Sequence, residues 1–176
     1  MVKVDISSIR ELRGGSIHFE GNQPIDVADS GLGFHLAQPV EIHGSVTNTG
    51  EGLLVQMKLS YTYQAVCARC LGDFTASQHV EVSEQFIAGE PLEDDSLFVF
   101  KGDSIDLDDC ITQNVWLAFP IKLLCSEECR GLCPDCGQNL NLQKCQCVHE
   151  SQNPQFEKLR TLLLEKGGGP NGKSEK

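Results

Sequence analysis

Hydrophobic and polar residues alternate through the middle of the chain. From Leu53 to Cys67 every second residue is apolar, and polar residues occupy most of the positions between them. A period of two is typical of a β-strand with one buried face. A second alternating run at 40–46 ends in a Gly-rich stretch at 48–52, which predicts an antiparallel hairpin. The apolar positions of the long strand are Leu53, Val55, Met57, Leu59, Tyr61, Tyr63, Ala65 and Cys67.

The alternation continues after a short turn at 71–73. Apolar residues recur from Phe74 to Phe86 with mostly polar residues between them, so a third strand completes a meander of consecutive strands. The run SLFVF at 96–100 predicts one further short strand.

The spacing of apolar residues changes to a helical period between 105 and 120. Asp106, Asp108 and Asp109 stand near the start, where the helix dipole favours acidic side chains, and Pro120 ends the run. This predicts a helix of about three turns. The apolar positions on its predicted face are Ile105, Ile111, Val115 and Ala118.

A second helix is predicted near the end of the sequence. Asn153 followed by Pro154 is a typical helix start, and a glycine run from 167 ends the pattern. The apolar stripe consists of Phe156, Leu159, Leu162 and Leu163.

The expected fold class is α+β, a mainly antiparallel β-sheet domain with two helices and an inserted cysteine-rich module. The predicted divisions are a β-rich domain ending in a helix at 1–121, the cysteine-rich module at 122–152, a helix packed on the domain at 153–166, and a disordered tail at 167–176.

Composition indicates an ordinary globular protein, with 40% hydrophobic and 22% charged residues. No apolar run reaches the roughly 18 residues of a membrane helix, and the first residues lack the apolar stretch of a secretion signal. We therefore expect no membrane partner and a cytoplasmic location.

Cysteines are concentrated in one part of the chain, because six of the nine lie between 125 and 147. An odd total and a reducing compartment favour metal binding over disulfides. Cys133 and Cys136 form a C-x-x-C turn followed by glycine, and Cys145 and Cys147 follow closely. Four thiolates at this spacing predict one tetrahedral Zn²⁺ site.

The remaining cysteines leave alternatives open. Cys125 and Cys129 have a spacing acceptable for zinc, either as an alternative pair or as part of a second site. Cys67 and Cys70 form another C-x-x-C and are a possible partner pair, although two half-buried thiols at a strand end would explain them equally well. Cys110 is expected to be a small core residue.

No catalytic motif is evident. The five histidines form no helical metal pair or nucleophile motif, and no Gly-rich phosphate loop is present. The acidic residues at 93–95 and 103–109 are better explained by a solvated loop and a helix start than by a magnesium site. We therefore expect neither an enzyme nor a small-molecule substrate.

The cysteine-rich stretch resembles a known family. Its motifs are Cys67-Ala-Arg-Cys70-Leu, then Cys129-Arg-Gly-Leu-Cys133-Pro-Asp-Cys136-Gly-Gln-Asn-Leu-Asn, Cys145-Gln-Cys147 and Asn153-Pro-Gln. Together they resemble the bacterial and plastid YceD family, the large ribosomal RNA subunit accumulation proteins, although that family usually has Asp-Pro-Arg at the last motif. The resemblance covers about residues 40–165. It implies a role in the synthesis, processing or stability of the large-subunit (23S) ribosomal RNA, without a known enzymatic activity.

The charge of the chain constrains how such a role would be performed. The net charge is −11, and between 81 and 109 many acidic residues accompany only Lys101. Phosphate binding normally needs clustered basic residues, so we expect ribosomal RNA to bind only weakly. The expected partner is a basic ribosomal protein or an RNA-processing factor of the large subunit. The residues predicted to contact a partner or RNA are Glu93, Asp94, Asp95, Lys122, Arg130 and Lys144.

Two alternative functions remain. Clustered thiols also suit a zinc-thiol redox switch, which releases metal on oxidation. The acidic residues leave a metal-dependent RNA-processing enzyme as the other alternative. The direct partner, the pairing of cysteines and the oligomeric state do not follow from the sequence.

Overall fold

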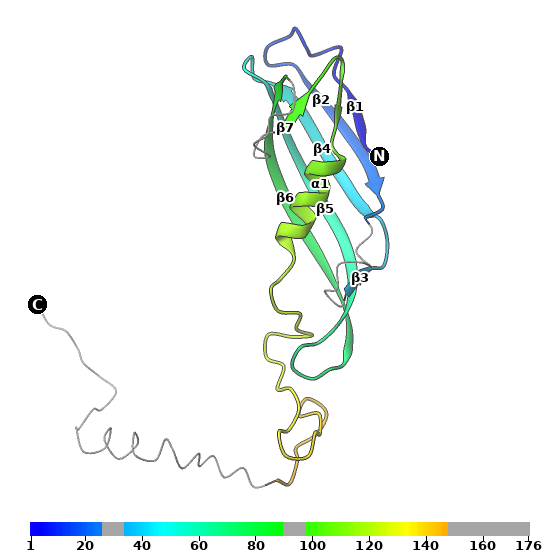
Figure 1. Cartoon of the computed structure of the whole chain (residues 1–176), viewed down its shortest axis with the longest axis vertical. Helices are drawn as coiled ribbons and strands as arrows, with labels where there is room; N and C mark the ends of the chain where they lie inside the picture. Colours follow the sequence, from blue (N-terminus) through cyan, green and yellow to red (C-terminus); the bar gives the residue numbers. More distant parts are fainter. Residues whose placement is uncertain (26–33, 90–97, 148–176) are drawn as a thin grey trace, which may run out of the picture.

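The structure, a computed structural model, describes residues 1–25, 34–89 and 98–147, and it consists of a long curved sheet with one helix (Figure 1). In chain order its elements are β1 (Lys3–Asp5), β2 (Ser16–Gln23), β3 (Phe34–Leu36), β4 (Val40–Asn48), β5 (Leu53–Val66), β6 (Asp73–Ala88), β7 (Phe98–Phe100), β8 (Ser104–Asp106) and α1 (Asp108–Ala118).

The main sheet has six strands in the order β2-β4-β5-β6-β7, and β3 also pairs with β5. The predicted meander β4–β5–β6 is confirmed, with Leu59 opposite both Ile42 and Val80. All neighbours in this sheet are antiparallel except β6 and β7, which pair in parallel over three residues. The mainly antiparallel sheet is therefore confirmed.

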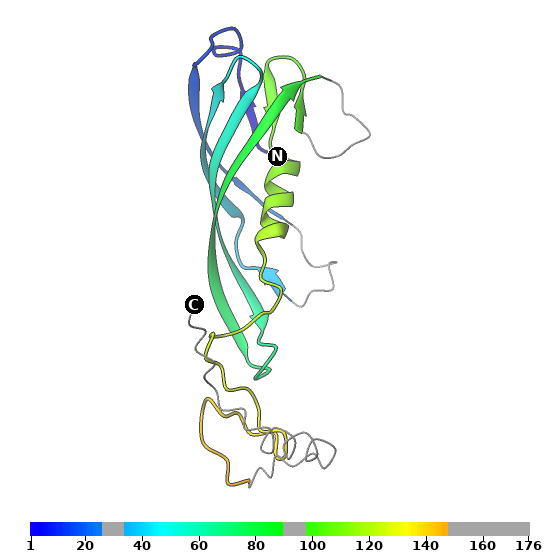
Figure 2. The same cartoon turned by 90° about the vertical axis from the view of Figure 1, so that its left-hand side faces the viewer.

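One face of the sheet carries the hydrophobic core. Every second residue of β5 from Leu53 to Ala65 is buried, as the alternation predicted. Helix α1 lies across this face (Figure 2) and contributes Cys110, Ile111 and Val115 to the core. Cys110 is thus confirmed as a core residue, and its burial raises its pKa to about 12.

The end of α1 is fixed by an aromatic cluster. Phe119 follows the helix in extended conformation and stacks on Phe34, with ring centroids 3.9 Å apart. Its ring also lies edge-on to Tyr63 of β5, at 5.2 Å. The chain that follows α1 therefore starts beside the last residues of β5.

The predicted helix start was wrong, because the first residues of the predicted helix form the short strand β8. Ile105 lies in β8 and pairs with Val4 of β1, where it is fully buried. Pairing with the N-terminal strand gives Ile105 a buried place that helical periodicity alone does not reveal. The amide of Val2 then donates to the Asp108 carboxylate at 2.6 Å, next to the first helical turn.

Only one helix occurs in the described part of the chain, and it is not long and apolar enough to span a membrane. The second predicted helix at 153–166 and the predicted tail at 167–176 lie outside the described residues. The proposed domain boundaries remain predictions.

Strands β5 and β6 extend further than their neighbour β4. The pairing of β4 with β5 ends at Glu41 and Ser60, whereas β5 and β6 stay paired to Val66 and Asp73. The tip of this hairpin, at 67–72, lies at the same end of the molecule as the chain that follows α1 (Figures 1 and 2). This arrangement brings two cysteine-bearing segments together.

Candidate metal centres

The first C-x-x-C turn forms the tip of the β5–β6 hairpin. The amide of Leu71 donates to the carbonyl of Cys67 at 2.9 Å, and the amide of Cys67 donates to the carbonyl of Gly72 at 2.9 Å. Leu71 has a φ of +54°, a conformation that glycine adopts more easily. This tight turn places the thiols of Cys67 and Cys70 in one cluster.

The chain after α1 is attached to this tip by hydrogen bonds. The amide of Ala68 donates to the carbonyl of Leu123 at 2.8 Å. The Arg69 guanidinium Nη1 donates to the carbonyls of Glu127 and Cys129, both at 3.0 Å. A Cβ atom at Gly131 would lie 3.0 Å from the Arg69 carbonyl oxygen, so glycine permits the close approach of the two segments.

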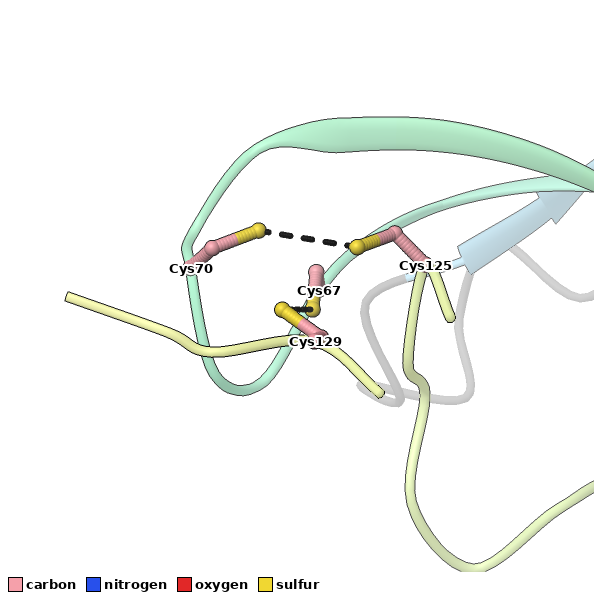
Figure 3. Close-up of side chains that lie close together, drawn as sticks. All are labelled: Cys67, Cys70, Cys125 and Cys129. Atoms are coloured by element: carbon pink, nitrogen blue, oxygen red, sulfur yellow. Dashed lines mark hydrogen bonds between the residues drawn. The ribbon is translucent and has the colours of Figure 1, made fainter. Parts of the chain in front are cut away.

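Four cysteines meet where these segments join (Figure 3). We call Cys67, Cys70, Cys125 and Cys129 the bridging cluster, because two come from the hairpin tip and two from the chain after α1. Their Sγ atoms all lie within 4.8 Å of one another. The Sγ atoms of Cys67 and Cys129 are 3.8 Å apart, and those of Cys70 and Cys125 are 3.7 Å apart.

These distances fit a tetrahedral thiolate site. A Zn–S bond of about 2.3 Å implies about 3.8 Å between sulfurs in a regular tetrahedron. A disulfide would require about 2.05 Å, and all nine cysteines are free. The three buried thiols of the bridging cluster also pack against Phe74, Leu124 and Leu132, which shield them from water, whereas Cys125 is exposed.

A second group of four cysteines comes from one short stretch of the chain, residues 133–147. We call Cys133, Cys136, Cys145 and Cys147 the local cluster, and its Sγ atoms also lie within 4.8 Å of one another. The amide of Gly137 donates to the carbonyl of Cys133 at 2.9 Å, and the amide of Cys133 donates to the carbonyl of Gln138 at 2.8 Å. These are the same two backbone bonds that close the first C-x-x-C turn.

A short antiparallel ribbon of residues 129–141 joins the two clusters. The amide of Leu140 donates to the carbonyl of Gly131 at 2.9 Å, and Leu132 and Asn139 form a β-bridge. At one end, Asn141 Nδ2 donates to the Sγ atom of Cys129 at 3.2 Å. We call this segment the linking ribbon.

Hydrogen bonds lower the pKa of particular thiols in each cluster. Burial opposes ionisation of Cys67, but backbone amides of Cys125, Cys70 and Arg69 lower its pKa to about 6. In the local cluster the backbone amide of Cys136 is the main cause that lowers the pKa of Cys133 to about 6. Each cluster therefore offers a thiolate at neutral pH, the form that binds metal.

Other thiols keep their protons more strongly. The hydrogen bond to Cys129 is the main cause that raises the pKa of Cys125 to about 12, and the bond to Cys136 does the same for Cys147. A divalent cation would displace these protons on binding.

The structure places all eight cysteines proposed from the sequence in two groups of four. It places Cys125 and Cys129 in the same group as Cys67 and Cys70. Lys122, Arg130 and Lys144 are exposed on the cysteine-bearing segment. Glu93, Asp94 and Asp95 lie outside the described residues. The roles of all these residues remain predictions.

Sequence reasoning missed the residues that support the clusters. Arg69, Gly131 and Asn141 carry no signal in cysteine spacing, because their importance depends on contacts between segments far apart in the chain. All three residues stand within the motifs that carry the family resemblance, which was the available hint.

The sequence profile described as "Large ribosomal RNA subunit accumulation protein YceD" matches residues 55–163. The chain belongs to the YceD family. The matched region begins inside β5 and contains both cysteine clusters.

Relatives of this YceD family chain include an uncharacterized protein of Mycobacterium tuberculosis, 31% identical over 67% of this chain and 59% of the relative. An Arabidopsis thaliana protein, named "Large ribosomal RNA subunit accumulation protein YCED homolog 1, chloroplastic", is 36% identical over 33% of this chain and 18% of its own length. An uncharacterized Bacillus subtilis protein is 23% identical over 72% of this chain and 76% of its own length. The chain thus spans 59% of the mycobacterial relative, and no solved structure matches it significantly.

Proposed function

We propose that this protein is a non-enzymatic factor for the synthesis, processing or stability of large-subunit (23S) ribosomal RNA, acting in ribosome assembly in the cytoplasm. The observation that carries the proposal is the family match over residues 55–163. The printed name of the Arabidopsis relative supports the same role. The match to that relative covers 33% of this chain.

Each cysteine cluster is proposed to bind one Zn²⁺. Four thiolates are a donor set that zinc prefers, and the sulfur separations of the bridging cluster suit its tetrahedral geometry. Bound zinc supplies a rigid cross-link between chain segments. Arg69 and the linking ribbon position the thiols, so the segment from 123 to 147 is presented as an ordered extension of the sheet.

The acidic residues near α1 support a non-enzymatic role, because their carboxylates contact separate structural partners. Asp103 binds Arg10 at 2.6 Å, and Asp106 lies 3.5 Å from Lys3. Among the described residues, the groups of three or more possible ligands close enough to share a metal are the two cysteine clusters. These carboxylates are therefore poor candidates for a catalytic magnesium site.

The charge of the chain favours a protein partner over naked RNA. A net charge of −11 repels a phosphate backbone, and each four-thiolate zinc site adds further negative charge. The proposed partner is therefore a basic ribosomal protein or processing factor of the large subunit. Lys122, Arg130 and Lys144 are the candidates for a minor direct RNA contact.

The test is to delete the gene in its host and measure 23S ribosomal RNA against 16S ribosomal RNA. We expect 23S ribosomal RNA to fall selectively and to recover when the full chain is restored. Tagged protein should sediment with large-subunit precursors at about 150 mM salt. Unchanged 23S ribosomal RNA with no co-sedimentation would contradict the proposal.

Two matched variants separate a protein partner from direct RNA binding. Charge reversal of Glu93, Asp94 and Asp95 should weaken association with the precursor, whereas neutralising Lys122, Arg130 and Lys144 should change it little. Submicromolar binding of purified protein to protein-free ribosomal RNA, lost in the second variant and kept in the first, would instead favour direct RNA recognition.

A zinc-thiol redox switch is the second candidate function, favoured by the exposure of one ligand in each cluster. Cys125 and Cys136 are exposed, so an oxidant can reach them. This function requires reversible zinc loss and disulfide formation under mild peroxide. Retention of zinc under those conditions would support the structural role.

A further inference from the structure

The linking ribbon has one metal-binding pair of thiols at its turn and one ligand of the other cluster at its base. Its turn contains Cys133 and Cys136, and its base contains Cys129. Two backbone hydrogen bonds, Leu140 to Gly131 and Cys133 to Gln138, hold its strands together on either side of the pair Leu132 and Asn139. The position of Cys129 therefore depends on the same short element that forms the local cluster.

Asn141 connects this element directly to the bridging cluster. It belongs to the loop between Cys136 and Cys145, yet its Nδ2 atom donates to the Sγ atom of Cys129 at 3.2 Å. Its Oδ1 atom accepts from the amide of Arg130 at 2.7 Å. The same side chain thus fixes the backbone beside Cys129 and contacts the sulfur itself.

We propose that the two clusters bind two Zn²⁺ ions as one coupled unit, in which Asn141 is the positioning residue that transmits occupancy of the local cluster to the bridging cluster. This inference rests on the proposed zinc binding and is independent of the proposed role in ribosome assembly.

The physical basis is ordering combined with charge compensation. Metal in the local cluster closes the loop that carries Asn141, which removes conformational freedom that binding at the bridging cluster would otherwise have to remove. An N–H donor also stabilises the negative charge on a ligand sulfur, and such outer contacts typically alter metal affinity about 10- to 100-fold.

A competing effect opposes cooperative binding. Four thiolates and one Zn²⁺ leave each site with a net charge of about −2, so the two sites repel each other. The amide of Arg69 donates to Cys67 at 3.5 Å and Asn141 donates to Cys129. These donors offset part of the negative charge, and water screens the rest, so we expect ordering to dominate.

The test measures zinc affinity of full-length protein, freed of metal under reducing conditions, by competition with a chelating dye. Cys136→Ser/Cys147→Ser retains only the bridging site, and Cys67→Ser/Cys70→Ser retains only the local site. The overall two-zinc affinity of the unaltered protein should exceed the product of the two single-site affinities by about tenfold. An NMR spectrum of the sheet amides confirms that each variant is folded.

Variants with all eight thiols test Asn141 itself. Asn141→Ala should weaken the bridging site about tenfold. Asn141→Asp keeps an acceptor for the Arg130 amide but removes the N–H donor, and it should weaken the site at least as much. Gln143→Ala, in the same loop, is the matched control and should leave both affinities unchanged.

Co²⁺ provides a readout that a general loss of stability would not change. The thiolate-to-cobalt absorption of the bridging site, measured with the local cluster also occupied, should shift in Asn141→Ala, because the Cys129 sulfur has lost its donor. Two independent sites, a stoichiometry below two metals, or an Asn141→Asp variant with unaltered affinity would each overturn the proposal. None of these results would by itself alter the 23S ribosomal RNA measurement.

Discussion

The bridging cluster and the local cluster use the same donor atoms but depend on different parts of the fold. In the bridging cluster, the paired thiols Cys67 and Cys129 are 62 residues apart, and Cys70 and Cys125 are 55 apart. The local cluster draws its ligands from residues 133–147. The sheet and helix therefore organise the first cluster, whereas the second is organised by its own turn.

The surroundings of the two clusters differ in the same way. Three of the four thiols of the bridging cluster are buried beside apolar side chains, and Cys125 is exposed. In the local cluster only Cys133 is buried. A cross-link between distant segments constrains the unfolded chain more than one within a short loop, so the bridging metal should contribute more to global stability.

The largest expected difference comes from removing one ligand of each cluster. Cys67→Ser should eliminate one equivalent of zinc and lower the free energy of unfolding by about 4 kcal/mol at a free zinc concentration 1,000 times Kd. Trypsin should then cleave after Lys122 about 100-fold faster, because the segment is no longer attached to the hairpin. Chemical denaturation and limited proteolysis measure both effects.

Cys133→Ser is the matched comparison. It should also eliminate one equivalent of zinc, but it should lower the free energy of unfolding of the sheet by only about 1.4 kcal/mol, because no strand contributes to the local cluster and the coupling to the bridging site is about tenfold. Equal destabilisation by the two substitutions would show that the clusters have the same structural weight and would contradict the comparison.

An intermediate effect is expected from the arginine that attaches the two segments of the bridging cluster. Arg69→Ala removes two hydrogen bonds to the carbonyls of Glu127 and Cys129. Its side chain is exposed, so the free energy of unfolding should fall by about 1 kcal/mol. Arg130→Ala makes the same change in charge nearby and should have less than half this effect in the same denaturation experiment.

The smallest effect concerns the residue after each C-x-x-C turn. Leu71 and Gly137 make equivalent backbone bonds at φ values of +54° and +72°, but only glycine adopts this conformation without strain. Leu71 is 66% exposed, so Leu71→Gly loses little burial and should slow zinc release from the bridging cluster. Gly137→Ala should speed release from the local cluster about fivefold, since about 1 kcal/mol of strain is introduced.

A metal-release assay with a chromogenic chelator distinguishes these rates. A Cβ at Gly137 would contact nothing within 4 Å, so steric crowding does not complicate the second substitution. Unchanged release rates in both variants would show that the backbone conformation after the turn does not control metal retention.

The sequence predicted features whose signal lies in neighbouring residues. Alternation identified β4, β5 and β6, and close spacing grouped Cys133, Cys136, Cys145 and Cys147. It did not identify the short strands β1, β3 and β8, because three residues carry too little periodic pattern. It also missed the eight-residue strand β2, although Ile17 and Phe19 alternate with polar residues there. It also left the ligand partners of Cys67 and Cys70 undecided, since the length of the β5–β6 hairpin and the path after α1 determine that pairing.

The separation of the bridging-cluster cysteines along the chain also determines the order in which they become available during synthesis on the ribosome. The pair Cys67 and Cys70 emerges long before Cys125 and Cys129, and it must wait for the rest of its site. The β5–β6 hairpin and α1 have time to form in that interval, because local folding takes microseconds while translation adds about 5–20 residues each second. A newly made chain therefore presents a folded hairpin with an incomplete bridging cluster at its tip until Cys125 and Cys129 emerge.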